Sequence, residues 1–167
     1  MKNVRFLILM ILFSHLSIAG FTQYKKNAVV AEIAGKSFSF FGLEYERFLT
    51  ERFRIGTGIG IGSKEQLVYG NGDTFDRYNF SVPVYGVYAW GRKKHHAITE
   101  FGFTLRGVTG PVTKASFDEF YPYVSYGYEF KSDIFVFRIP VYLCYVGSSD
   151  FFPAVIPWLG LSFGVVL

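Results

Sequence analysis

The stretch Phe53-Arg54-Ile55-Gly56-Thr57-Gly58-Ile59-Gly60-Ile61-Gly62 alternates at every residue between two kinds of side chain. Phe, Ile and Thr occupy the odd positions, and Arg and Gly occupy the even positions. Because successive side chains of a β-strand point to opposite faces, this alternation is a strand signal. The glycines do not have the spacing of a dinucleotide-binding or P-loop motif, and no helical pattern follows them. The segment therefore predicts a strand with one large apolar face and one small face.

The same period of two recurs along the chain, and no segment after residue 20 shows a helical period. In 134–147, for example, Phe137, Ile139 and Val141 oppose Arg138 and Tyr142. The predicted strands are 27–34, 39–48, 52–62, 78–90, 97–106, 120–131, 134–147 and 155–167.

The predicted connections differ between the two ends of these strands. The short turns are 49–51, 91–94 and 131–133, and the longer loops are 63–77, 108–119 and 148–154, while 35–38 is tight. An even strand number with short turns on one side and longer loops on the other is typical of an outer-membrane barrel. We therefore expect an all-β fold, an eight-stranded antiparallel up-and-down transmembrane β-barrel.

Composition narrows the function classes. The chain has 167 residues, of which 50% are hydrophobic, 20% aromatic and 18% charged, with a formal net charge of +4. Such a chain is too apolar for a disordered protein and too weakly basic to predict nucleic-acid binding. The single cysteine, Cys144, can form neither an internal disulfide nor a zinc cluster, and the sequence predicts no cofactor and no metal.

The N-terminus has the features of a secretory signal peptide. Lys2 and Arg5 precede the apolar run 6–13, and small residues follow it up to Ala19. A membrane-spanning helix would need about 20 apolar residues. We expect residues 1–19 to be a cleaved signal peptide and 20–167 to form the barrel domain.

Alternation alone leaves open which face meets solvent. A soluble, lipocalin-like barrel would enclose the large apolar face, but the interior of an eight-stranded barrel can be filled by side chains only once. The other face, built of Gly, Ser, Tyr and isolated charges, suits a narrow lumen better than water. We therefore place the apolar face against lipid.

Strand parity assigns most of the charged strand residues to the lumen. These are Glu32, Glu44, Glu46, Arg52, Arg54, Glu100, Arg106, Glu129, Lys131 and Arg138. Five acids and five bases can neutralise one another, so we expect a plugged, salt-bridged lumen. The same parity predicts that seven aromatic side chains also point inward, namely Phe40, Phe48, Tyr85, Tyr121, Tyr123, Tyr142 and Trp158.

On this pattern, and on the segments 27–32, 42–48 and 157–167, the chain resembles the small eight-stranded outer-membrane β-barrel family. Its last strand is similar to the C-terminal signal read by the barrel-insertion machinery, although it ends in Leu167 instead of an aromatic residue. The resemblance implies an integral outer-membrane protein whose partners are outer-membrane lipid and that machinery. With the signal peptide cleaved, both termini lie in the periplasm. Members of the family include structural proteins, adhesins, small pores and lipid-modifying enzymes.

Few residues suggest catalysis or ligand binding. His95 and His96 follow a short turn, far along the chain from Ser148, and adjacent strand residues point to opposite faces, so we expect neither an enzyme nor a metal site there. Basic residues gather on the side of the short turns, namely Lys25, Lys26, Arg92, Lys93 and Lys94. They could contact anionic lipid headgroups or serve solubility alone.

Two functions from different classes therefore stay open. The first is a structural or surface-binding barrel whose outer loops, chiefly 63–77 and 108–119, meet an unknown extracellular ligand. The second is a narrow pore for water, ions or small solutes. An outer-leaflet lipid-modifying enzyme is a remote third hypothesis.

Overall fold

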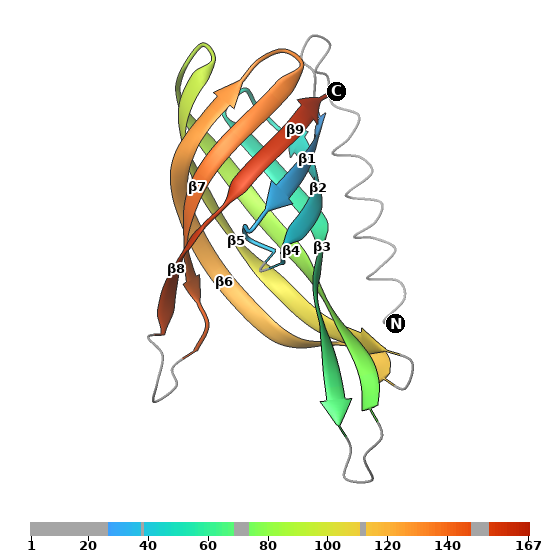
Figure 1. The fold of residues 1–167 in the computed structure, drawn as a ribbon. Coiled ribbons are helices and arrows are strands. Elements are labelled where there is room, and N and C mark those ends of the chain that lie inside the picture. Colours follow the sequence, from blue (N-terminus) through green and yellow to red (C-terminus); the bar gives the residue numbers. More distant parts are fainter. Residues whose placement is uncertain (1–26, 38, 69–73, 111–112, 148–153) are drawn as a thin grey trace, which may run out of the picture.

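The described part of the chain is a closed β-barrel. The computed structural model describes residues 27–37, 39–68, 74–110, 113–147 and 154–167. Its strands are β1 (Asn27–Ile33), β2 (Phe41–Phe48), β3 (Phe53–Val68), β4 (Thr74–Arg92), β5 (His95–Gly110), β6 (Thr113–Lys131), β7 (Phe135–Tyr145), β8 (Val155–Leu159) and β9 (Leu161–Val166). Figure 1 shows them wound around one axis. The predicted signal peptide lies outside the described residues.

Antiparallel pairing closes the barrel. Each strand from β1 to β7 pairs with the next, and β1 also pairs with β9, which in turn pairs with β7. β8 and β9 are two parts of one strand, interrupted at Gly160, and both pair with β7. The predicted eight-stranded antiparallel barrel is therefore confirmed.

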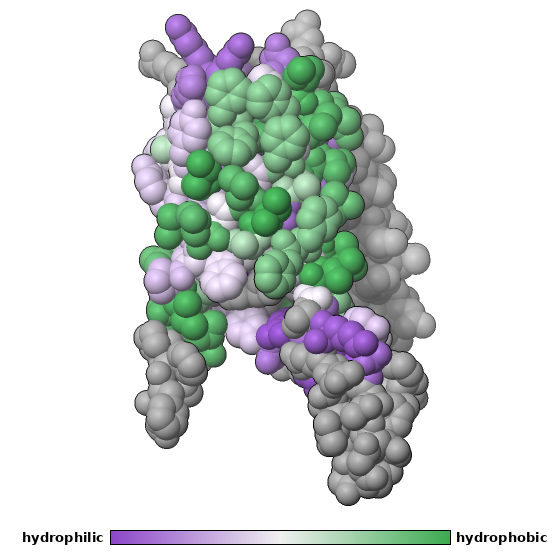
Figure 2. Space-filling model, in the orientation of Figure 1, coloured by the Kyte–Doolittle hydropathy of each residue, from purple (hydrophilic) through white to green (hydrophobic). Residues whose placement is uncertain are grey.

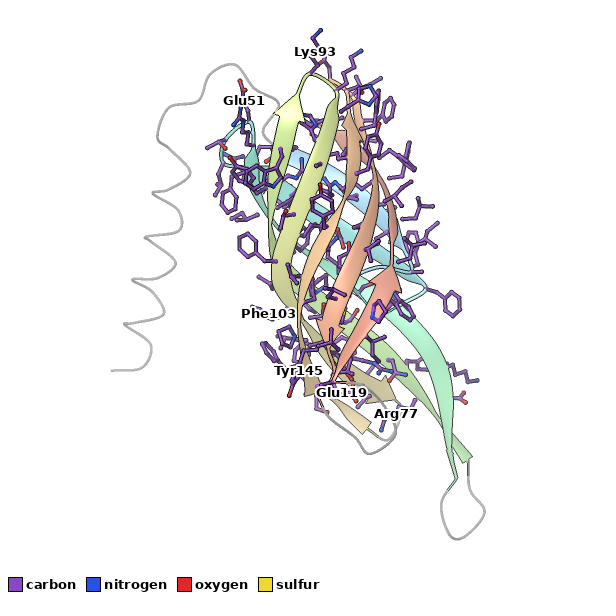
Figure 3. All side chains as sticks on the ribbon, turned by 90° about the vertical axis from the view of Figure 1, so that its left-hand side faces the viewer. Glu51, Arg77, Lys93, Phe103, Glu119 and Tyr145 are labelled. Atoms are coloured by element: carbon purple, nitrogen blue, oxygen red, sulfur yellow. The ribbon has the colours of Figure 1, made fainter. Side chains whose placement is uncertain are left out.

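The two ends of the barrel differ in their connections (Figure 1). At one end, here the turn end, lie the tight connections β2–β3, β4–β5 and β6–β7 and both ends of the described chain. At the other, the hairpin end, β3 and β4 continue as a long two-stranded ribbon. In Figure 3, Lys93 and Glu51 mark the turn end, and Arg77 and Glu119 mark the hairpin end.

At the hairpin end, two segments predicted to be loops are mostly strand. β3 and β4 remain paired out to Val68 and Thr74, and β5 and β6 out to Gly110 and Thr113, so most of 63–77 and 108–119 is strand. Charged and polar residues in these segments weaken the alternation on which the sequence prediction relied. Cross-strand backbone pairing supports the ribbons where the apolar pattern stops.

The predicted apolar face lies outside. Large apolar residues on the outer face are exposed, as Ile59 is at 53%, whereas their strand neighbours pointing inward are buried. On the face seen in Figure 2, hydrophobic residues cover the middle of the barrel, and hydrophilic residues gather towards its two ends. This is the surface expected of a barrel with lipid around it and polar groups inside.

The barrel wall is uneven, because β1 and β2 are much shorter than β3 to β6. Their pairing ends at Ile33 and Phe41, and the connecting loop therefore lies part of the way along the barrel instead of at its rim. This loop supplies an important part of the lumen. Among the described residues, no helix has the length and apolar character needed to cross a membrane.

Candidate functional site in the barrel lumen

Most of the charged residues predicted to face the lumen are buried inside the barrel. Seven of the ten have side chains almost completely removed from solvent: Glu32, Glu44, Glu46, Arg54, Glu100, Glu129 and Arg138. They come from β1, β2, β3, β5, β6 and β7, which places them around the whole circumference. An eighth buried charge, Lys36, comes from the β1–β2 loop and was not predicted.

The Lys36 cluster, defined as Lys36, Glu32, Glu44 and Glu100, lies at the centre of the lumen. The Lys36 ammonium nitrogen is 3.0 Å from Glu32 Oε1, 3.0 Å from Glu44 Oε2 and 3.5 Å from Glu100 Oε2. All four side chains are fully buried. One lysine thus connects carboxylates from three strands across the barrel.

The local backbone explains how Lys36 reaches this position. Ala34 has a left-handed φ of 49°, which ends β1 and turns the chain inward. A Cβ at Gly35 would lie 1.9 Å from the Glu32 carboxyl carbon, so only glycine leaves room for that side chain. The Thr104 hydroxyl donates a 2.6 Å hydrogen bond to the Lys36 carbonyl and ties the loop to β5. The β1–β2 loop is therefore bound to the opposite wall.

The arginine cluster, defined as Arg54, Arg138, Glu46 and Glu129, lies nearer the turn end. Arg138 donates two hydrogen bonds to Glu46, of 2.6 Å and 2.7 Å, and one of 2.7 Å to Glu129. Arg54 donates to Glu129 through both terminal nitrogens, and its Nε is 3.3 Å from Glu46 Oε2. Such paired, multiply bonded guanidinium–carboxylate contacts are the strong kind of ion pair.

Two tyrosines hydrogen-bond to the buried carboxylates, and one of them, Tyr85, joins the two clusters into one network. The Tyr85 hydroxyl lies 2.7 Å from Glu44 Oε2 and 3.0 Å from Glu46 Oε1, one carboxylate from each cluster. The Tyr142 hydroxyl lies 2.8 Å from Glu32 Oε1 and 3.2 Å from Glu100 Oε2. In addition, the Lys36 nitrogen is 4.3 Å from the centre of the Tyr85 ring, within cation–π range.

The lumen-facing glycines make room for these rings. A Cβ at Gly56 would lie 2.4 Å from Tyr85 Cζ, and a Cβ at Gly160 would lie 2.7 Å from Tyr142 Cε2. Both distances are far below ordinary van der Waals contact. The alternating glycines of β3 are therefore positions where the opposing side chains fill the space.

Three of the ten predicted charges lie outside the network. Arg52 is exposed, because Thr50 accepts hydrogen bonds from the Arg52 and Phe53 amides and keeps this residue in the turn. Arg106 pairs with Glu119 at 3.2 Å towards the hairpin end and keeps 30% of its side chain exposed. Lys131 is half-buried, with its nitrogen 4.0 Å from the Phe48 ring centre.

The inward placement of one aromatic residue, Phe40, was also wrong. Phe40 is 83% exposed, because it lies in the loop before β2, where strand parity does not apply. Trp158 keeps its predicted face, since it is the direct strand partner of the buried Tyr142, and its indole nitrogen donates a 3.0 Å hydrogen bond to the Ala34 carbonyl of the β1–β2 loop.

The buried charges do not balance as predicted. Among the described residues, the two clusters together contain five carboxylates, from Glu32, Glu44, Glu46, Glu100 and Glu129, against the three bases Lys36, Arg54 and Arg138. The arginine cluster is neutral by formal charge, and the excess of acid lies around Lys36. This makes Lys36 the side chain on which the central part of the network most depends.

Comparison with known proteins adds evidence on the fold. No protein-family model matches the sequence, and the curated proteins contain no match. The N-terminal β-barrel domain of OprF from Pseudomonas aeruginosa superposes with a TM-score of 0.59 at 12% identity, over 86% of this chain and 98% of that one.

Two further solved structures are similar to a lesser degree. Neisserial surface protein A has a TM-score of 0.49 at 12% identity, over 85% of this chain and 95% of that one. The attachment invasion locus protein of Yersinia pestis, solved with the heparin analogue sucrose octasulfate, has a TM-score of 0.40 at 11% identity, over 84% and 92%. The strand pairing and the superposition on the OprF barrel domain show that the chain has the fold of the small eight-stranded outer-membrane β-barrels.

Proposed function

We propose that this protein is an integral outer-membrane barrel with a plugged, salt-bridged lumen that works through the surface of its hairpin end. In this proposal the turn end and both termini face the periplasm, and the hairpins face the exterior. The protein acts as a structural or surface-binding platform, not as a channel or an enzyme.

The observation that carries the plug is the placement of Lys36. Its side chain joins Glu32, Glu44 and Glu100 from three different strands, and Tyr142 lies within 3.4 Å of its nitrogen. A permeating ion would have to separate these buried pairs, and removing a partner from a buried ion pair costs about 3–5 kcal/mol. The arginine cluster forms a second paired layer nearer the turn end.

The ribbons at the hairpin end support the surface-binding role. β3 and β4 extend well beyond the loop that closes the lumen (Figure 1), and Lys64 and Asp76 form an exposed 2.8 Å ion pair across them. Backbone pairing out to Val68 and Thr74 makes this ribbon a defined surface rather than a loose loop. Ordered, polar projections of this kind suit recognition outside the membrane.

A binding role is also favoured over catalysis by the position of the histidines. His95 and His96 lie at the turn end, and His96 Nδ1 is 3.6 Å from Glu129 of the arginine cluster. Within the described residues, no serine or cysteine is hydrogen-bonded to either ring. The outer-loop residues Ser148 and Ser149 lie outside the described residues.

Planar-bilayer recording tests the plug. Purified protein, first shown to be folded by its faster gel migration before boiling, is expected to give no reproducible single-channel steps. Regular steps of one amplitude would overturn the plug and favour the alternative function, a narrow pore. The orientation is tested separately by an epitope inserted between Val68 and Thr74, which antibody should reach on intact cells and not only after lysis.

A further inference from the structure

The outer wall of the barrel contains a groove near the turn end. It has a volume of about 540 Å³ and lies across β5, β6 and β7. Its lining includes His95, Ala97, Tyr126, Tyr128, Ile139 and Val141. The groove opens on the lipid-facing surface, and His96, which also lines it, lies 3.6 Å from Glu129 of the arginine cluster.

Strand register explains why a groove forms here. Trp90, Ala97, Tyr128 and Ile139 follow one another in a row across β4, β5, β6 and β7, each the direct partner of the next. Ala97 is the smallest side chain in this row. The wall is therefore low at Ala97, beside the exposed Tyr128 side chain, and the groove there is lined mainly by apolar atoms.

The end of the groove nearest the turn is polar and basic. His95 Nδ1 is 2.6 Å from the Tyr128 hydroxyl, and when that hydroxyl donates to Nδ1 the ring carries its proton on Nε2. The adjoining β4–β5 turn contains two consecutive lysines, Lys93 and Lys94, and both side chains are exposed. Figure 3 shows Lys93 projecting from the tip of this turn.

A nearby acid reduces this positive charge without cancelling it. The neighbouring β6–β7 turn contains the exposed Asp133, and the two turns are joined by a hydrogen bond from the Lys131 amide to the Lys94 carbonyl. Against this one carboxylate stand the two exposed lysines of the β4–β5 turn. The rim of the groove thus keeps an excess of positive charge.

We propose that this groove binds an anionic phospholipid of the leaflet that meets the turn end. One acyl chain lies along Ala97, Tyr126 and Val141, and the headgroup phosphate contacts Lys93, Lys94 and His95. The apolar hollow and the basic rim match the two ends of such a lipid. The inference depends on the membrane location in the proposed function but not on whether the lumen conducts.

The chain provides its own reporter for this site. It has two tryptophans, and Trp90 is the direct strand partner of Ala97. In a Trp158→Phe background, fluorescence therefore comes from Trp90 alone. The protein is refolded into phosphatidylcholine vesicles that contain equal small fractions of brominated phosphatidylglycerol or brominated phosphatidylcholine, and quenching by the two lipids is compared.

Brominated phosphatidylglycerol is expected to be enriched at Trp90 at least about fivefold at low ionic strength. Each of the two lysines near an anionic surface contributes about 1 kcal/mol, which corresponds to about fivefold. Lys93→Gln with Lys94→Gln should abolish most of this preference. Arg52→Gln, which removes an exposed charge from a different turn at the same end, should leave it unchanged. Ala97→Leu, which fills the groove, should lower quenching by both brominated lipids.

The alternatives give different results. Equal quenching by the two headgroups would mean ordinary lipid contact without selection and would overturn the proposal. A preference that survives the Lys93→Gln and Lys94→Gln changes would place the selection elsewhere and would also overturn it. Faster gel migration before boiling shows for each variant that the barrel has folded. If the parent protein does not migrate faster before boiling, the result counts against the proposed membrane barrel itself. A failure of the lipid-binding proposal can therefore be told apart from a failure of the proposed function.

Discussion

Replacement of Lys36 by methionine removes the central cation of the lumen while keeping a side chain of similar length. The ammonium is within 3.5 Å of carboxylates from Glu32, Glu44 and Glu100, and all four side chains are fully buried. Removing one partner of a buried ion pair leaves uncompensated charge, which costs about 3–5 kcal/mol. We therefore expect Lys36→Met to lower the free energy of unfolding by about this amount at pH 8.

Denaturant unfolding from lipid vesicles at pH 8, followed by tryptophan fluorescence, measures this loss. Lys64→Met is the matched control, because Lys64 forms a 2.8 Å ion pair with Asp76 in which both side chains remain well exposed. Such surface pairs contribute little, so this variant should stay close to wild type. A loss below about 1 kcal/mol for Lys36→Met would refute the central role of Lys36.

Three further substitutions test other parts of the structure by the same unfolding measurement. Ile59→Arg places a charge on the exposed apolar band and should lower the free energy of unfolding by about 2–4 kcal/mol. Ser116→Arg, on an exposed part of β6 near the hairpin end, should behave like wild type. Equal effects would mean that the membrane-facing surface is wrongly assigned. Gly56→Val places its Cβ against the Tyr85 ring and should cost about 1–3 kcal/mol through overpacking, and combining it with Tyr85→Leu should be clearly less than additive. Arg138→Met breaks the bidentate pair with Glu46 and should lower the free energy of unfolding by about 3–5 kcal/mol. Arg52→Met in the exposed turn should have little effect. Similar losses for both variants would argue against the arginine cluster.

Strand periodicity was sufficient to predict the barrel, and the structure shows why. In residues 53–61 of β3 and in β7, even positions point inward and odd positions point outward, so parity places Arg54 and Arg138 in the lumen. The prediction became less accurate wherever residues leave this regular backbone. Arg52 is held in a turn by Thr50, and Phe40 precedes β2, so parity assigned both side chains to the wrong environment.

Lys36 was missed for the same physical reason. It lies in a loop, and alternation along a strand gives no information about a loop that folds back into the barrel. The surrounding sequence does contain a signal, because Gly35, Ser37 and Ser39 are small residues typical of close backbone packing. The ribbons at the hairpin end were missed because their polar residues interrupt the apolar alternation, although their backbones remain paired.

Chemical modification of lysines in the wild-type protein tests most directly whether Lys36 fills the lumen. The folded barrel is treated briefly with a small water-soluble acylating reagent, and modification at each lysine is quantified by mass spectrometry before and after heating in detergent. Lys64, Lys93 and Lys94 have exposed side chains, whereas Lys36 is fully buried. We predict that the three exposed lysines are acylated in the folded protein and that Lys36 reacts only after heating. Acylation of Lys36 in the folded barrel at the same rate as Lys64 would contradict the closed, salt-bridged lumen.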